Sequence, residues 1–206
     1  MDGTGMFAPS LDWGAELWLS LNWIAVGWAI AAVATLAVAT FLRYFTSWGR
    51  QFWRISGNYF KGPASVPVWA MLALVLLLVI AGVRLQVLFS FQGRDMLTSI
   101  QVVGSGLTSG NQEIRQSGID GFWFSIKVFC ILATLHISRL LFDMYLIQRF
   151  CLRWRTWLTD YLTGDWLDGK AYYRARFIDS SIDNPDQRIQ GDIDIFTANN
   201  GPLPNV

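Results

Sequence analysis

Two long runs of apolar residues dominate the first half of the chain. No charged residue occurs over 17–42 or over 62–83. As an α-helix, the first run would be about 39 Å long, which exceeds the roughly 30 Å hydrocarbon core of a bilayer. Both runs are too long and too uniformly apolar for ordinary buried helices of a soluble protein. The pattern therefore predicts transmembrane helices over 17–44 and 63–91.

A third apolar and aromatic run begins at Phe122 and ends near Arg149. It contains four ionisable side chains: Lys127, His136, Arg139 and Asp143. Its length and its aromatic ends still suit a membrane-spanning helix. After Arg149 the apolar residues keep an approximate helical period, without proline, as far as Trp166. We therefore expect one helix over 122–170 that spans the membrane and extends into the cytoplasm.

The charges that flank these runs predict an orientation. Residues 43–61 hold four basic side chains and no acid, and residues 149–176 hold Lys170 and five arginines. The N-terminal segment 1–16 has acids and no base. The positive-inside rule therefore places the N-terminus outside and the C-terminal tail in the cytoplasm. The predicted fold class is an all-α integral membrane protein with several spans.

Between the spans lie segments of different composition. Segment 45–62 is basic and aromatic, and its pattern is typical of a helix at the cytoplasmic interface; a short loop with interfacial anchors is the alternative. The aromatic side chains expected to face lipid are Trp48, Phe52, Trp53 and Phe60. Segment 92–121 is rich in Gly, Ser and Thr, and we expect an external loop with short helical pieces. Segment 1–16 is predicted to be extracytoplasmic.

Three ionisable residues of the third span share one face of the predicted helix. His136, Arg139 and Asp143 fall within about 60° of one another, whereas Lys127 points the opposite way. Arg139 and Asp143 have the spacing of an i, i+4 ion pair. Because such groups are costly in a membrane, we expect a polar stripe that faces a cavity or a neighbouring helix. The alternative is a structural ion pair near the membrane edge.

Candidate catalytic chemistry is sparse in this chain. His136 is the sole histidine, so no metal-ligand spacing occurs. Cys130 and Cys151 would be about 30 Å apart on one helix, which is too far for a disulfide. The basic residues lie beside apolar spans, where anionic lipid explains them without nucleic acid. We therefore expect no enzyme activity, metal or nucleic-acid partner for this chain.

Residues 164–171, GDWLDGKA, match a phosphate-binding P-loop except at the last position. Ala171 stands where a Ser or Thr hydroxyl would hold Mg²⁺. Asp165 and Asp168 would place carboxylates against the phosphates, and an amphipathic helix precedes the motif where a buried strand is required. We therefore expect no ATP site and no cofactor in this stretch.

The sequence near the C-terminus carries a helix start and a family resemblance. Asn184 is a capping residue, Pro185 suits the first helical position, Asp186 favours the helix dipole, and Gln187 completes a capping box. RFCLRWRTWLTDYLTGDWLDGKAYYR followed by IDNPDQRIQGDIDIF resembles the transmembrane domain of SbmA/BacA-like ABC transporters. FLRYFTSWGRQFW and VRLQVLFSFQGRDM resemble the mycobacterial BacA-related ABC transporters in particular, so the resemblance covers nearly the whole chain.

This resemblance implies an ATP-driven, homodimeric permease of the inner membrane, with an ABC transporter type 1 fold, that moves hydrophilic or amphipathic compounds such as cobalamin, bleomycin or peptides. The span 17–44 would be an extra N-terminal helix. Segment 171–206 would hold the intracellular coupling loop, in which five residues contact a nucleotide-binding domain: Asn184, Pro185, Asp186, Gln187 and Arg188. ATP and Mg²⁺ would bind that domain, which this chain lacks.

The chain is expected to be the N-terminal part of such a transporter, because members of the family continue through further spans and a nucleotide-binding domain. A truncated product, one part of a split gene and a mispredicted reading frame all fit this expectation. The remaining membrane helices and the nucleotide-binding domain would then be partners supplied in trans. The alternative is a non-transporting membrane scaffold or interaction protein, or a non-functional remnant of a truncated gene.

Overall fold

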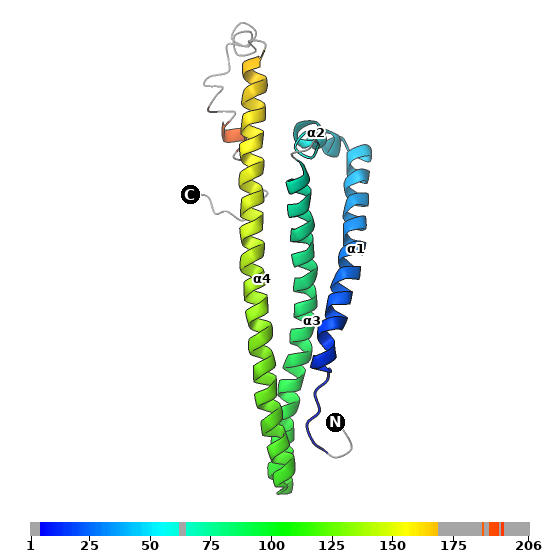
Figure 1. The fold of residues 1–206 in the computed structure, drawn as a ribbon, viewed down its shortest axis with the longest axis vertical. Coiled ribbons are helices and arrows are strands. Elements are labelled where there is room, and N and C mark those ends of the chain that lie inside the picture. Colours follow the sequence, from blue (N-terminus) through cyan, green and yellow to red (C-terminus); the bar gives the residue numbers. More distant parts are fainter. Residues whose placement is uncertain (1–4, 62–64, 169–186, 188–189, 194, 196–206) are drawn as a thin grey trace. The chain divides into compact units, whose positions relative to one another are not determined.

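A computed structural model describes residues 5–61, 65–168, 187, 190–193 and 195. Its helices are α1 (Trp13–Phe45), α2 (Ser47–Ser56), α3 (Val66–Ser109) and α4 (Gln112–Leu167), and no strand occurs among these residues (Figure 1). Three of the helices, α1, α3 and α4, are long and apolar enough to cross a membrane. The predicted all-α class with three candidate spans is therefore confirmed.

Helix α2 occupies the segment that the sequence assigned either to an interfacial helix or to a loop. Its N-cap is Thr46, whose hydroxyl oxygen accepts a hydrogen bond from the backbone N–H of Gly49 at 3.3 Å. Such a cap satisfies a backbone donor that the first turn leaves free. Gly57 follows the last helical residue, and its N–H donates to the carbonyl of Trp53 at 2.9 Å. The helical alternative therefore holds for this segment.

The expected loop over 92–121 is instead almost entirely helical. Helix α3 continues to Ser109, helix α4 begins at Gln112, and the chain turns at Gly110, which has a φ of 68°. Asn111 caps α4, because its side-chain oxygen accepts from the N–H of Glu113 at 2.9 Å. This two-residue connection makes α3 and α4 an antiparallel pair (Figure 1).

Close helix packing explains why small residues gave a misleading loop signal here. A Cβ added to Gly118 of α4 would lie 2.7 Å from the backbone nitrogen of Val103 and 3.0 Å from the carbonyl oxygen of Ser99, both in α3. A Cβ at Gly106 would similarly meet the backbone of Arg115. Small residues let the backbones of membrane helices approach closely. The composition therefore reflects a helix–helix contact.

The chain divides into two compact units. The first comprises the described residues within Met1–Leu36 and Leu74–Asp143, and the second those within Ala37–Ala73 and Met144–Val206. Polar contacts between α1, α3 and α4 distinguish the first unit. An aromatic core between α2, the start of α3 and the later part of α4 distinguishes the second.

Candidate functional site: polar contacts of the membrane helices

Arg139 of α4 is anchored to the backbone of α3. Its Nη1 donates a hydrogen bond to the carbonyl oxygen of Leu78 at 3.0 Å. Gly82, one turn further along α3, is buried, and a Cβ there would overlap the guanidinium group. The missing side chain of Gly82 thus makes the notch that Arg139 occupies. Nothing in the sequence marked this glycine among the small residues of an apolar run.

Arg139 also makes the predicted pair with Asp143. Its Nη2 lies 3.7 Å from Oδ2 of Asp143, and the two side chains are 16% and 17% exposed. In a medium of low dielectric constant, neither charge is tolerated well alone. The pairing and the carbonyl contact together give the guanidinium two partners. The i, i+4 spacing in the sequence therefore predicted this ion pair correctly.

His136 lies on the same helix, but its contact is aromatic. Its ring meets the ring of Phe89 of α3 edge to face, with 5.8 Å between centroids. Three buried polar atoms of this stripe have no hydrogen-bond partner among the described residues: His136 Nδ1, Arg139 Nε and Asp143 Oδ1. Lys127, on the opposite side of α4, is exposed. The stripe thus contacts α3 and retains capacity for further polar partners.

A second charged contact, between α1 and α3, was not predicted from the sequence. Arg84 forms an ion pair with Glu16, and its Nε donates to the hydroxyl of Ser20 at 3.0 Å. The Ser20 hydroxyl donates to Oε1 of Glu16 at 2.9 Å, so the three groups share one network. Glu16 is only 5% exposed. The sequence did carry a signal for this ion pair. Glu16 immediately precedes the first apolar run and Arg84 immediately follows the second, and the two charges are opposite.

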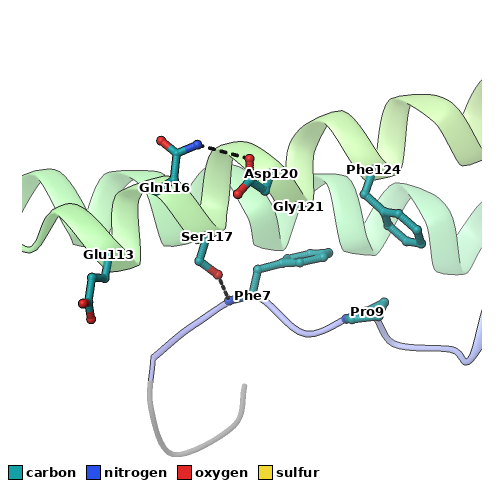
Figure 2. Close-up of a pocket in the computed structure, with 8 residues that line it drawn as sticks. All are labelled: Phe7, Pro9, Glu113, Gln116, Ser117, Asp120, Gly121 and Phe124. Atoms are coloured by element: carbon teal, nitrogen blue, oxygen red, sulfur yellow. Dashed lines mark hydrogen bonds between the residues drawn. The ribbon is translucent and has the colours of Figure 1, made fainter.

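The N-terminal segment before α1 is attached to α3 and α4 by backbone donors. The N–H of Phe7 donates to Oγ of Ser117 at 3.0 Å, and the N–H of Ser10 donates to Oδ1 of Asp95 at 3.0 Å. The ring of Phe7 covers Gly121, which has no side chain to displace it (Figure 2). An open pocket of about 670 Å³ lies beside this contact, lined by Phe7, Pro9, Glu113, Gln116, Ser117, Asp120, Gly121 and Phe124.

In the second unit, aromatic residues join α2 to the later part of α4. Tyr59, Val68 and Trp154 form a buried core, against which four further rings pack: Phe52, Phe60, Phe150 and Trp157. The side-chain amide of Asn58 donates to the Tyr161 hydroxyl at 3.3 Å. Burial raises the pKa of the Tyr59 hydroxyl above its usual value, and the charge of Arg153 offsets part of this rise. Tyr59 is therefore neutral at physiological pH.

This core changes one expectation about the interfacial segment. Phe52, Trp53 and Phe60 were expected to face lipid, but they are half-buried against other rings, with Phe52 6.4 Å from Trp154 and Trp53 6.1 Å from Phe60 between centroids. Trp48 is 66% exposed. The physical reason is that Trp154 of α4 and neighbouring rings of the same segment offered apolar surface, which the sequence of the segment alone did not reveal.

The region of the P-loop match is helical where it is described. Gly164, Asp165, Trp166 and Leu167 belong to α4. A phosphate-binding loop begins after a strand, whereas this part of the motif is helical. The remaining residues of the motif, 169–171, lie outside the described residues. No group of metal-binding side chains occurs among the described residues.

The predicted coupling residues fall mostly outside the described residues. Asn184, Pro185, Asp186 and Arg188 are not among them, and Gln187 has a helical backbone and an exposed side chain. The contact with a nucleotide-binding domain that the resemblance implied for these five residues stays a prediction.

Comparison with known proteins identifies the family. Residues 55–203 match the family described as ABC transporter transmembrane region 2. An ABC transporter ATP-binding protein of Haemophilus influenzae is 32% identical over 152 residues, which are 74% of this chain and 23% of that protein. ABC transporter D family member 2, chloroplastic, of Arabidopsis thaliana is 28% identical over 153 residues, which are 74% of this chain and 19% of that protein.

A third relative is the lysosomal cobalamin transporter ABCD4 of Homo sapiens, which is 32% identical over 78 residues, or 38% of this chain and 13% of that protein. The chain therefore spans less than a quarter of the length of each of these relatives. The family match covers α3 and α4 completely, the same helices that carry Gly82, Arg139 and Asp143. On this basis the chain is a multi-pass membrane protein that belongs to the ABC transporter transmembrane region 2 family.

Proposed function

We propose that this chain is the N-terminal part of the transmembrane domain of an ABC transporter that moves hydrophilic or amphipathic compounds, of the cobalamin, bleomycin or peptide class, across the inner membrane. The family match over 55–203 carries the proposal. The substrate class is supported by the resemblance to SbmA/BacA-like transporters and by the relative that transports cobalamin. The N-terminus would lie outside and the tail in the cytoplasm, as the flanking charges predict.

The polar stripe of α4 is the proposed contribution of this chain to the pathway. Arg139 is held in place by the Leu78 carbonyl and Asp143, so its guanidinium has a defined position. The unpaired polar atoms of His136, Arg139 and Asp143 can bind water or polar groups of a passing compound. Arg139 is thus proposed as a positioning residue of the cavity wall.

The partners in this proposal are a nucleotide-binding domain, the remaining membrane helices and a second copy of the assembly. ATP and Mg²⁺ would bind the nucleotide-binding domain. Residues 184–188 would contact that domain and transmit its movement to the membrane helices. Replacing Asp186 by Asn or Arg188 by Gln would then leave ATP hydrolysis intact while transport falls, because the mechanical link is weakened.

The test begins with the partners. The full chain, carrying an affinity tag, is cross-linked in native membranes, and the captured proteins are identified by mass spectrometry. Capture of an ABC nucleotide-binding domain supports the proposal. If no ABC ATPase is cross-linked, the result contradicts the proposal. It then favours a membrane scaffold or interaction protein, or a non-functional remnant.

Uptake is then measured in cells without their own cobalamin importer, with the chain expressed beside its captured partners. We expect ATP-dependent uptake of labelled cobalamin, sensitivity to bleomycin, or both. Arg139→Gln should lower uptake by at least fivefold, whereas Lys127→Gln removes a charge from the opposite side of the same helix and should leave uptake unchanged. Equal effects of the two variants would contradict the proposed role of the stripe.

A further inference from the structure

Helix α2 connects the ends of two candidate membrane spans. It joins α1 to α3, and both of these helices are long and apolar enough to cross a bilayer. Only Thr46 separates the end of α1 from the start of α2, so α2 stays next to that end of the α1 span. One face of α2 is therefore presented to the headgroup region unless protein covers it.

The protein covers one face of α2 and thereby fixes the rotation of the helix. Phe52 and Trp53 pack on the aromatic rings described above, and Gly49 and Ser56 on the same side are buried. The guanidinium of Arg43 stacks on the Trp53 ring at 4.5 Å from its centroid. With this face occupied, the opposite face is the surface that remains available.

The remaining face has one cationic edge and one apolar edge. At 100° per residue, Arg50 and Arg54 lie on one edge, and Trp48 and Ile55 on the other. All four side chains are exposed. Arg50 donates to the carbonyl oxygen of Tyr44 at 3.1 Å, which leaves other donors of its guanidinium group available, and Arg54 makes no ion pair within the described residues. No acid occurs anywhere over 43–61 to neutralise these charges.

We infer that this exposed face of α2 binds anionic phospholipid headgroups. Arg50 and Arg54 contact the lipid phosphates, as guanidinium groups do with paired N–H donors. Trp48 and Ile55 insert at the level of the headgroups and the first acyl carbons, where indole rings are favoured. The inference rests on the membrane location of the chain and goes beyond the proposed transport, so the two can fail separately.

The inference is tested on the full chain in phosphatidylcholine nanodiscs containing a trace of photo-activatable phosphatidylglycerol. Cross-linked residues are mapped by mass spectrometry, while unlabelled lipids compete. We expect cross-links within 47–61 that phosphatidylglycerol displaces and phosphatidylcholine does not. A basic residue at an anionic surface is worth roughly fivefold in affinity. Arg50→Gln with Arg54→Gln should therefore weaken this competition on the order of tenfold.

The matched control is Arg94→Gln with Arg115→Gln, which removes the same charge from two exposed positions in the first unit. It should leave the cross-links within 47–61 unchanged. Raising the salt concentration should weaken competition in the unmodified chain, because exposed charges are screened, and this readout needs no variant. Equal competition by the two lipids, an equal effect of the control pair, or displacement by RNA but not by phosphatidylglycerol would overturn the inference.

Discussion

The notch at Gly82 provides a direct test of how Arg139 is held. Gly82→Ala adds a methyl group where the guanidinium of Arg139 lies, so the guanidinium must move and its hydrogen bond to Leu78 is lost. Hydrogen bonds between membrane helices contribute about 0.6 kcal/mol on average and up to about 1.7 kcal/mol. Alanine also favours the helix over glycine by roughly 0.5–1 kcal/mol. The two effects oppose each other.

The variant alone should therefore change the free energy of unfolding by less than about 1 kcal/mol, in either direction. In the Arg139→Ala background the guanidinium is absent, and Gly82→Ala should stabilise by roughly 0.5–1 kcal/mol. The coupling free energy between the two substitutions is then about 1 kcal/mol. This value exceeds the deviation from additivity that is typical of independent sites, which is roughly 0.3–0.5 kcal/mol. The assay is reversible unfolding in mixed micelles. Unfolding is monitored through the loss of the circular dichroism signal of the helices.

Gly93→Ala is the matched control for this cycle. Gly93 lies in the same helix, and a Cβ there would meet no atom within 4 Å. Its substitution should give the same stabilisation with and without Arg139. If Gly82→Ala were also additive with Arg139→Ala, the notch would not hold the guanidinium and the account of the site would be wrong.

Three further predictions concern the other contacts. Glu16→Gln leaves Arg84 without its counter-charge and should cost about 3 kcal/mol of unfolding free energy, whereas adding Arg84→Gln should recover part of that loss. Trp154→Ala should cost about 3 kcal/mol and expose α2 to protease, while Leu152→Ala, at a position 60% exposed, should do neither in timed digestion. Because folding raises the pKa of Tyr59, its contribution to the free energy of unfolding should be complete below pH 10.0 and be lost as the pH rises further. Tyr59→Phe should abolish this alkaline loss, measured by thermal unfolding at several pH values.

The apolar runs predicted the candidate spans because a membrane-spanning helix is set by the length and the apolar composition of a continuous stretch. Both properties can be read directly from a sequence. The Arg139–Asp143 pair was predictable for a similar reason, since helical spacing is a local property. Contacts between helices were harder. Gly82 differs from other glycines of apolar runs only through the side chain that reaches it from α4. The segment that contains Gly106 and Gly118 was predicted to be a loop, because small residues occur both in turns and where helices pack closely.

The contact between Arg139 and α3 also bears on how the chain enters the membrane during synthesis. An arginine or aspartate at the centre of an inserting helix costs about 2.5–3.5 kcal/mol at the translocon. Helix α3 leaves the ribosome before α4, and the two are joined by only Gly110 and Asn111. The Leu78 carbonyl and the Gly82 notch are therefore synthesised before Arg139 and can receive it when α4 inserts. On this reasoning α3 would lower the insertion cost of α4, which has the lowest hydropathy of the three candidate spans among the described residues.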